Sequence, residues 1–154
     1  MAKQCSAFAV NAFRHYAFPL KSAISSPSLK TATSEQAKRV LYVDDMRELR
    51  EVARLALSRV GHKVDCSCDG RDAFELVKAN PGTFDVIITD HHMETMNGLE
   101  LVTKLREIQF GGLIAVVSSE LNADVEVEYR RLGIEKILYK PIALSELRSL
   151  VLEA

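Results

Sequence analysis

The chain has 154 residues and a formal net charge of −1 at pH 7, with 47% hydrophobic and 27% charged residues. This length and composition are those of one ordinary globular domain with a substantial core. Residues 1–38 carry five basic residues and one acidic residue, whereas residues 39–154 carry 15 basic and 20 acidic ones. An acidic globular part argues against direct nucleic-acid binding, because that function requires a basic surface.

The first 38 residues differ in composition from the rest of the chain. Residues 5–20, CSAFAVNAFRHYAFPL, are apolar and aromatic, but Asn11, Arg14 and His15 interrupt them, so we expect no transmembrane segment. The Ser/Thr-rich residues 22–36 are typical of a linker. We expect residues 1–38 to form a disordered or partly helical tail. A docking helix and an organelle transit peptide remain open as alternatives.

From residue 39 onward, predicted strands and helices alternate. Apolar runs predict strands at about 39–44, 63–68, 84–89, 112–117 and 134–139. Helical periodicity predicts helices at about 46–60, 70–80, 98–109, 121–132 and 143–153. Strands joined by single helices form right-handed crossovers, so residues 39–154 are expected to form an α/β, doubly wound domain with a parallel sheet of five strands.

The three cysteines of the chain form a sparse, odd set, which indicates a reducing compartment, and we expect a cytoplasmic protein. Cys66 and Cys68 are predicted to have a structural role, because no further cysteines complete a zinc site.

Polar side chains stand at the ends of four predicted strands. Asp44 and Asp45 follow the first, Asp90 the third, Ser118 the fourth and Lys140 the fifth. The carboxyl ends of parallel strands meet at one edge of the sheet, where open α/β folds bind their ligands. Three neighbouring carboxylates repel one another unless a cation lies among them, and oxygen ligands at a half-open edge suit Mg²⁺.

This set of groups is suited to phosphoryl transfer. Lys140 can offset the carboxylates at rest and bind a phosphoryl oxygen, and Ser118 offers a hydroxyl donor to the same group. Asp90 is the candidate nucleophile, which would form an aspartyl phosphate, while Asp44 and Asp45 hold the metal.

The segments VLYVDD, DVIITDHHMETMNGLEL, AVVSS and YKP, in this order, resemble the motifs of the response-regulator receiver family, the phospho-acceptors of two-component signalling. The resemblance runs from about residue 39 to the C-terminus. It implies a flavodoxin-like (βα)5 sandwich with strand order 2-1-3-4-5. It also implies a phospho-acceptor signalling protein rather than an enzyme, which receives its phosphoryl group from a sensor histidine kinase or a histidine phosphotransfer protein.

The same resemblance assigns residue roles. Asp90 accepts the phosphoryl group, and Asp45, Asp90 and the main-chain carbonyl of His92 ligate Mg²⁺, with Asp44 acting mainly through water. Ser118 and Lys140 bind the phosphoryl oxygens, and the Lys140–Pro141 peptide bond is cis.

Several positions depart from the usual receiver pattern. Glu94 follows Met93 where the family usually has proline, and Ile137 stands where an aromatic switch residue is common. His92 and Glu120 occupy positions that tune the lifetime of the phosphate in the family. His91 and His92 are adjacent on a loop, so we interpret His92 as a polar rim residue and expect no separate metal site there.

The output surface is expected on the fourth helix, fifth strand and fifth helix, where Val127 is predicted to be exposed. Binding of a downstream protein target there, as a monomer or weak dimer, fits a chain without a recognisable effector module. A phosphorylation-independent interaction module remains an alternative because of Glu94 and Ile137. Two other classes fit poorly. A haloacid-dehalogenase-type phosphohydrolase requires a second acid two residues after the nucleophile, and a flavin-binding loop would be Ser-, Thr- and Gly-rich, unlike DDMRE.

Overall fold

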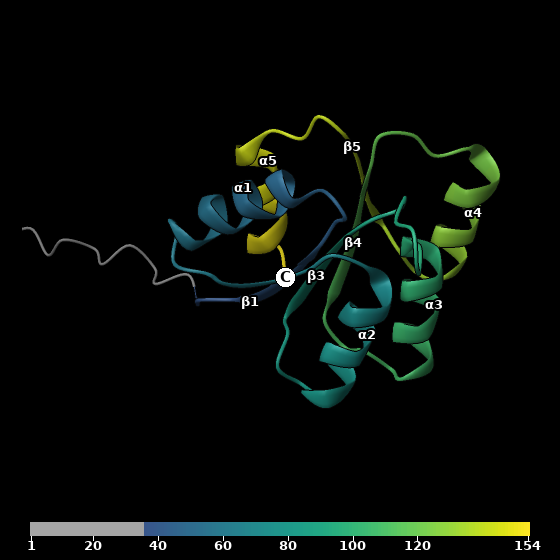
Figure 1. Ribbon diagram of the computed structural model, residues 1–154, viewed down its shortest axis with the longest axis horizontal. Coiled ribbons are helices and arrows are strands. Elements are labelled where there is room, and N and C mark those ends of the chain that lie inside the picture. The colour runs from purple at the N-terminus through teal and green to yellow at the C-terminus, as the bar shows by residue number, and fades with distance from the viewer. Residues whose placement is uncertain (1–35) are drawn as a thin grey trace, which may run out of the picture. The chain divides into compact units, whose positions relative to one another are not determined.

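The computed structural model describes residues 36–154, which alternate between strands and helices as predicted (Figure 1). The strands are β1 (Arg39–Val43), β2 (Lys63–Ser67), β3 (Val86–Asp90), β4 (Leu113–Ser118) and β5 (Lys136–Tyr139). The helices are α1 (Arg47–Ser58), α2 (Gly70–Ala79), α3 (Gly98–Glu107), α4 (Ala123–Arg131) and α5 (Leu144–Leu152). The predicted tail, residues 1–38, lies outside the described residues except for 36–38, so its three interpretations stay predictions.

The sheet is parallel throughout, with strand order β2-β1-β3-β4-β5, which confirms the predicted fold class. Figure 1 shows α1 and α5 together over one face of the sheet and α2, α3 and α4 over the other. Each face has its own hydrophobic cluster, so the central strands are covered on both sides. All five residues of β3 are buried, as expected for the middle strand of a doubly wound sheet.

Short polar side chains begin three of the five helices described here. Asp69 accepts hydrogen bonds from two main-chain amides at the start of α2, and Asn122 accepts one at the start of α4. Asn97 and Glu100 form a reciprocal capping box at the start of α3. These caps fix the starts of the helices that follow β2, β3 and β4, after loops of two to seven residues at this edge.

All five predicted strands differ from the observed strands by one or two residues at one end or both, and the differences are largest for the third and fifth strands. The third strand includes Asp90, which pairs with Val117, whereas the prediction ended that strand at residue 89. The fifth strand begins at Lys136 and not at 134, because the Ile134 amide donates to the Tyr129 carbonyl and closes the end of α4. Among the described helices, none is both long enough and apolar enough to cross a membrane.

Gly98 marks the tightest contact between α3 and the sheet. A Cβ atom at this position would lie 2.3 Å from the Asp90 carbonyl oxygen and 2.8 Å from the Tyr129 hydroxyl. Its amide donates to the His91 carbonyl at 3.0 Å, so the first residue of α3 lies directly against the end of β3. Only glycine allows this approach.

We therefore expect Gly98→Ala to lower the free energy of unfolding by about 1–3 kcal/mol or more, because the neighbouring backbone cannot yield. Gly111→Ala is the matched control, since nothing lies within 4 Å of a Cβ atom there. Urea denaturation of both variants measures the difference. Equal stabilities would show that the α3 contact is not tight.

Candidate functional site

Three carboxylates meet at the carboxyl edge of the sheet. Asp44 and Asp45 follow β1, and Asp90 ends the neighbouring strand β3. One oxygen from each lies within 4.8 Å of the others, in an arrangement that could hold a metal ion. Asp44 and Asp90 are 1% and 7% exposed, whereas Asp45 is open to solvent. A cation bound here would have oxygen ligands and an open side for water, which suits Mg²⁺.

Lys140 joins the two buried carboxylates. Its Nζ atom donates to Asp44 Oδ2 at 2.8 Å and to Asp90 Oδ2 at 2.9 Å. Its main-chain amide donates to the Ser118 carbonyl at 2.8 Å, and the Lys140–Pro141 bond is cis, as the resemblance implied. The ends of β4 and β5 therefore hold the ammonium group directly over the acids.

Burial and ion pairing act in opposite directions on these groups. Burial raises the pKa of Asp44, and this effect outweighs the hydrogen bonds from Lys140 and from the Met46 amide. Burial alone would lower the pKa of Lys140, but the hydrogen bonds to Asp44 and Asp90 reverse the direction and raise it. The charged form of Asp44 is thus costly, and Lys140 stays positively charged beside it.

The loop that carries the first two acids is fixed from α1. Arg50 donates through Nη1 to the main-chain carbonyls of Asp44 and Asp45, at 2.6 and 2.8 Å. The Met46 amide donates to Asp44 Oδ1 at 2.9 Å. With Lys140 on Oδ2, both oxygens of Asp44 already have hydrogen-bond donors, whereas Asp45 faces solvent.

Ser118 is fully buried at the end of β4. Its hydroxyl donates to the Glu120 carbonyl at 3.0 Å and lies 3.4 Å from His92 Nδ1. The side chains of His92, Glu94 and Glu120 are exposed, and His92 was the one interpreted as a rim residue. The hydroxyl, the ammonium and the carboxylates thus come together at one edge.

Comparison with known proteins decides the family. The sequence model of the response regulator receiver domain matches residues 40–152. The chain belongs to the response regulator receiver family. Such domains are signalling modules of two-component systems that generally bind Mg²⁺ in an acidic pocket and are phosphorylated.

Individual relatives support this assignment. The two-component response regulator 24 of Arabidopsis thaliana is 30% identical over 118 residues, which cover 77% of this chain and 84% of that protein. The sensor histidine kinase AruS of Pseudomonas aeruginosa is 35% identical over 138 residues, but the chain spans only 14% of its length. A response regulator receiver protein from Pseudomonas putida has a structure with TM-score 0.71 and 28% identity, covering 77% of this chain and 98% of that one.

The structure locates Ile137, a departure from the receiver pattern, and the exposed residues near it on α4 and β5. Ile137 is half-buried in β5, opposite Val116, and packs on the cluster beneath α3 and α4. Tyr139, two residues later, is 51% exposed, and its hydroxyl donates to Glu126 of α4 at 3.2 Å. Val127 is 47% exposed, as predicted. The α4–β5 surface therefore carries an exposed tyrosine and an exposed valine.

The hydrogen-bond partner of His91 was not predicted from the sequence. The His91 amide donates to Asp90 Oδ1 at 2.7 Å, and its ring atom Nδ1 lies 2.8 Å from the hydroxyl of Tyr129 in α4. Tyr129 is fully buried. A buried tyrosine hydroxyl requires a hydrogen-bond partner, and this requirement was the one signal in the sequence.

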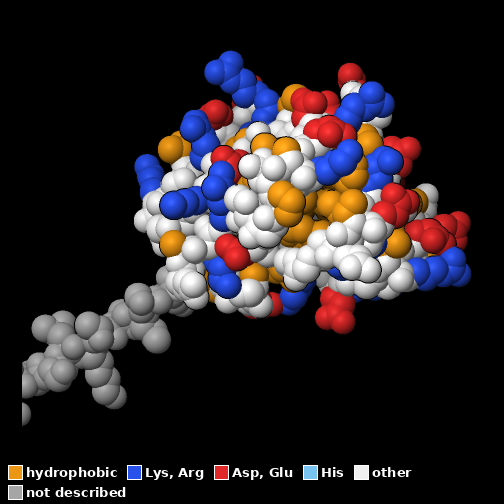
Figure 2. All heavy atoms as spheres, turned by 90° about the horizontal axis from the view of Figure 1, so that it is seen from below, with side chains coloured by type: hydrophobic (Ala, Val, Ile, Leu, Met, Phe, Trp, Pro, Cys, Tyr) orange, Lys and Arg blue, Asp and Glu red, His pale blue; other side chains and the backbone are white. Residues whose placement is uncertain are grey.

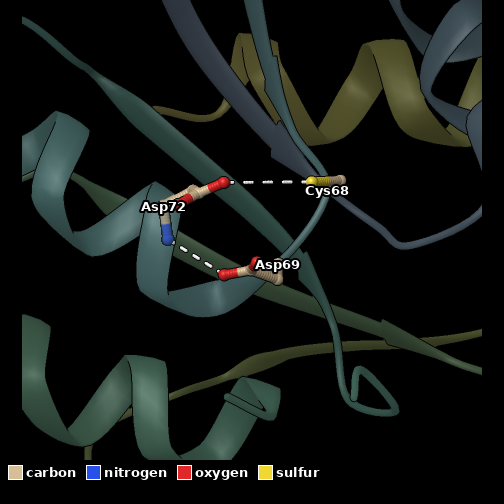
Figure 3. A group of neighbouring side chains, drawn as sticks. All are labelled: Cys68, Asp69 and Asp72. Atoms are coloured by element: carbon tan, nitrogen blue, oxygen red, sulfur yellow. Dashed lines mark hydrogen bonds between the residues drawn. The ribbon is translucent and has the colours of Figure 1, made fainter. Parts of the chain in front are cut away.

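A second acidic group lies at the start of α2. Figure 3 shows that Asp72 contacts both Cys68 and Asp69: Cys68 Sγ lies 3.9 Å from Asp72 Oδ2, and the Asp72 amide donates to Asp69 Oδ1. Asp69 also accepts from the Arg71 amide, so it caps the helix. These contacts give the two acids of the group a structural explanation, and the structural role of Cys68 stays a prediction.

We expect Mg²⁺ to raise the free energy of unfolding by about 2–3 kcal/mol at concentrations near one hundred times its dissociation constant. Asp45→Asn should remove most of this effect, because it takes away the most accessible of the three carboxylates. Asp72→Asn, in the second acidic group, should keep it. Thermal unfolding with and without Mg²⁺ measures all three proteins, and an effect lost only in Asp72→Asn would place the ion at α2.

Proposed function

We propose that the protein is a phospho-acceptor in a two-component phosphorelay, with Asp90 receiving a phosphoryl group from a phosphohistidine. The donor would be a sensor histidine kinase or a histidine phosphotransfer protein. The observation that carries the proposal is the placement of Lys140 Nζ within hydrogen-bond distance of both Asp44 and Asp90. A lysine that bridges two buried carboxylates already lies where phosphoryl oxygens would need positive charge.

In the transfer, an oxygen of Asp90 forms a bond to phosphorus as the bond from phosphorus to the histidine nitrogen breaks. The electron pair of the broken bond stays on that nitrogen. Lys140 and the Ser118 hydroxyl bind phosphoryl oxygens, and Asp44 and Asp45 would hold the metal together with Asp90. Mg²⁺, when bound, supplies positive charge that offsets the phosphoryl oxygens and the carboxylates. Hydrolysis of the aspartyl phosphate returns the site to rest.

The rim of the site would set the lifetime of the aspartyl phosphate. The side chains of His92 and Glu120 are exposed, and each stands two residues beyond Asp90 or Ser118, so they would control the access of water to Asp90. We propose the main-chain carbonyl of His92 as a further Mg²⁺ ligand.

The surroundings of the site suit a protein donor. An apolar groove of about 410 Å³ lies beside Lys140 and Pro141, between α1 and α5. Val52 and Leu144 line it and are 47% and 43% exposed, and Met46 beside the acids is 52% exposed. Exposed apolar side chains next to a reactive carboxylate offer a docking surface for a partner that must bring a histidine to Asp90.

A nucleic-acid partner is less suited to the face shown in Figure 2. Figure 2 shows one face of residues 36–154, where acidic and basic side chains are interspersed around a central hydrophobic area. This face presents no broad basic surface to phosphates. We therefore propose that the output is the binding of a downstream protein through the surface of α4, β5 and α5, switched by the state of Asp90.

Incubation with acetyl phosphate and Mg²⁺, followed by intact-mass analysis, tests the proposal. We expect one phosphoryl adduct that requires Mg²⁺, is lost in Asp90→Asn and persists in Asp65→Asn, a control at an exposed salt bridge on β2. Lys140→Met should slow adduct formation by about tenfold to a thousandfold, because it removes a donor to the phosphoryl group.

Beryllofluoride, a stable mimic of the phosphoryl group, distinguishes rapid hydrolysis of the aspartyl phosphate from a failure to form it. No adduct and no bound beryllofluoride would contradict the proposal and favour a phosphorylation-independent interaction module. An adduct that persists in Asp90→Asn would place the acceptor elsewhere.

A further inference from the structure

We propose that Tyr129 is a positioning residue that couples the state of Asp90 to α4 through His91. The inference rests on the proposed function, since it concerns how a change at Asp90 reaches the α4–β5 surface. The proposed link joins Tyr129 of α4 to His91 in the loop after β3. The β5 position that often carries an aromatic residue in the family is Ile137 in this chain.

Two hydrogen bonds form a short path from the acceptor carboxylate to α4. Asp90 Oδ1 accepts from the His91 main-chain amide at 2.7 Å. The ring of the same residue contacts the Tyr129 hydroxyl at 2.8 Å, with the two rings edge-to-face at 5.7 Å. A phosphoryl group on Asp90 changes the charge and the orientation of the carboxylate to which the His91 amide donates its hydrogen bond. The His91 ring then transmits that change to Tyr129.

The residues packed around Tyr129 leave little room for His91 to shift without displacing Tyr129. Tyr129 is fully buried, and Gly98 provides the space in which its hydroxyl reaches His91. The Gly98 amide holds the His91 carbonyl at 3.0 Å, so α3 restrains the main chain on the other side. In a close-packed interior, a shift of His91 is passed to its contact neighbours and not lost in empty space.

The polar atoms of this contact are chemically matched. The hydroxyl of Tyr129 can donate or accept a hydrogen bond, so it can pair with Nδ1 of His91 in either tautomer of the imidazole ring.

Tyr129 also connects α4 to β5. Its main-chain carbonyl accepts from the Ile134 amide at 2.9 Å, at the end of α4 and two residues before β5 begins. Val127 stands two residues earlier on the same helix and is exposed. Glu126 binds the hydroxyl of Tyr139 in β5. Movement of Tyr129 thus reaches both elements of the proposed output surface.

Ile137 explains why we expect the coupling to run through α4 in this chain and not through an aromatic residue in β5. Its aliphatic side chain has no hydroxyl or ring that could reach between Ser118 and the surface, although it lies in β5 beside the strand that ends in Ser118. A buried aromatic residue is present instead in α4, with its polar end at the residue after the acceptor. The structure therefore offers one aromatic path from Asp90 to α4 among the residues described.

The test uses the full-length chain with Mg²⁺ and beryllofluoride, followed by amide NMR spectra. In the wild type we expect shifts both near Ser118 and along α4, including Val127. In Tyr129→Phe, which removes only the hydroxyl, beryllofluoride should still bind and the Ser118 shifts should persist. The α4 shifts should fall to about half or less. Tyr42→Phe, at a buried tyrosine of the opposite core cluster, should keep the full α4 response.

Comparing the two single variants with the double variant gives a result that a general loss of stability would not produce. His91→Leu should reduce the α4 response as much as Tyr129→Phe, and the double variant should lose no more than either single one. A full α4 response in Tyr129→Phe would overturn the coupling while leaving the acceptor site intact. No beryllofluoride binding by the wild type would instead contradict the proposed function and the coupling with it.

Discussion

The ion pair between Lys140 and two buried carboxylates is the interaction on which the rest of this structure depends. Two unit charges about 4 Å apart repel by roughly 4 kcal/mol at an effective dielectric of about 20, and the sheet edge gathers three acids. Burial already raises the pKa of Asp44, so the folded chain holds a carboxylate in an unfavourable environment. Lys140 offsets this cost at rest, and a cation or a phosphoryl group would change the balance of charge at the same atoms.

The fold explains why these groups meet. The parallel order places β1, β3, β4 and β5 side by side, so the residues at their carboxyl ends converge although they come from positions 44 to 140. Arg50 and the capped helix starts fix the loops around them. The burial of β3 on both faces leaves Asp90 with little freedom to move away from Lys140. Stability and function therefore compete at this edge, because the charges that serve the site also strain the fold.

Much of this arrangement could be predicted from the sequence, for a clear physical reason. Apolar runs followed by Asp44, Asp90, Ser118 and Lys140 define both the strands and the polar ends, and short connections limit how such strands can be ordered. The strand order itself came from the family resemblance. Contacts that depend on three-dimensional packing were not predictable. The His91–Tyr129 hydrogen bond joins residues 38 positions apart, and the end of α4 depends on the Tyr129–Ile134 bond.

The most direct test of the central ion pair is a double-mutant cycle in urea, with and without Mg²⁺. Without Mg²⁺, Lys140→Met should cost about 3–5 kcal/mol of unfolding free energy, because it leaves buried carboxylates unpaired. The cost should be clearly smaller in an Asp90→Asn background, and Mg²⁺ should restore part of the stability when Asp90 is present. An equal cost in both backgrounds, unaffected by Mg²⁺, would contradict the account and reduce Lys140 to an ordinary surface lysine.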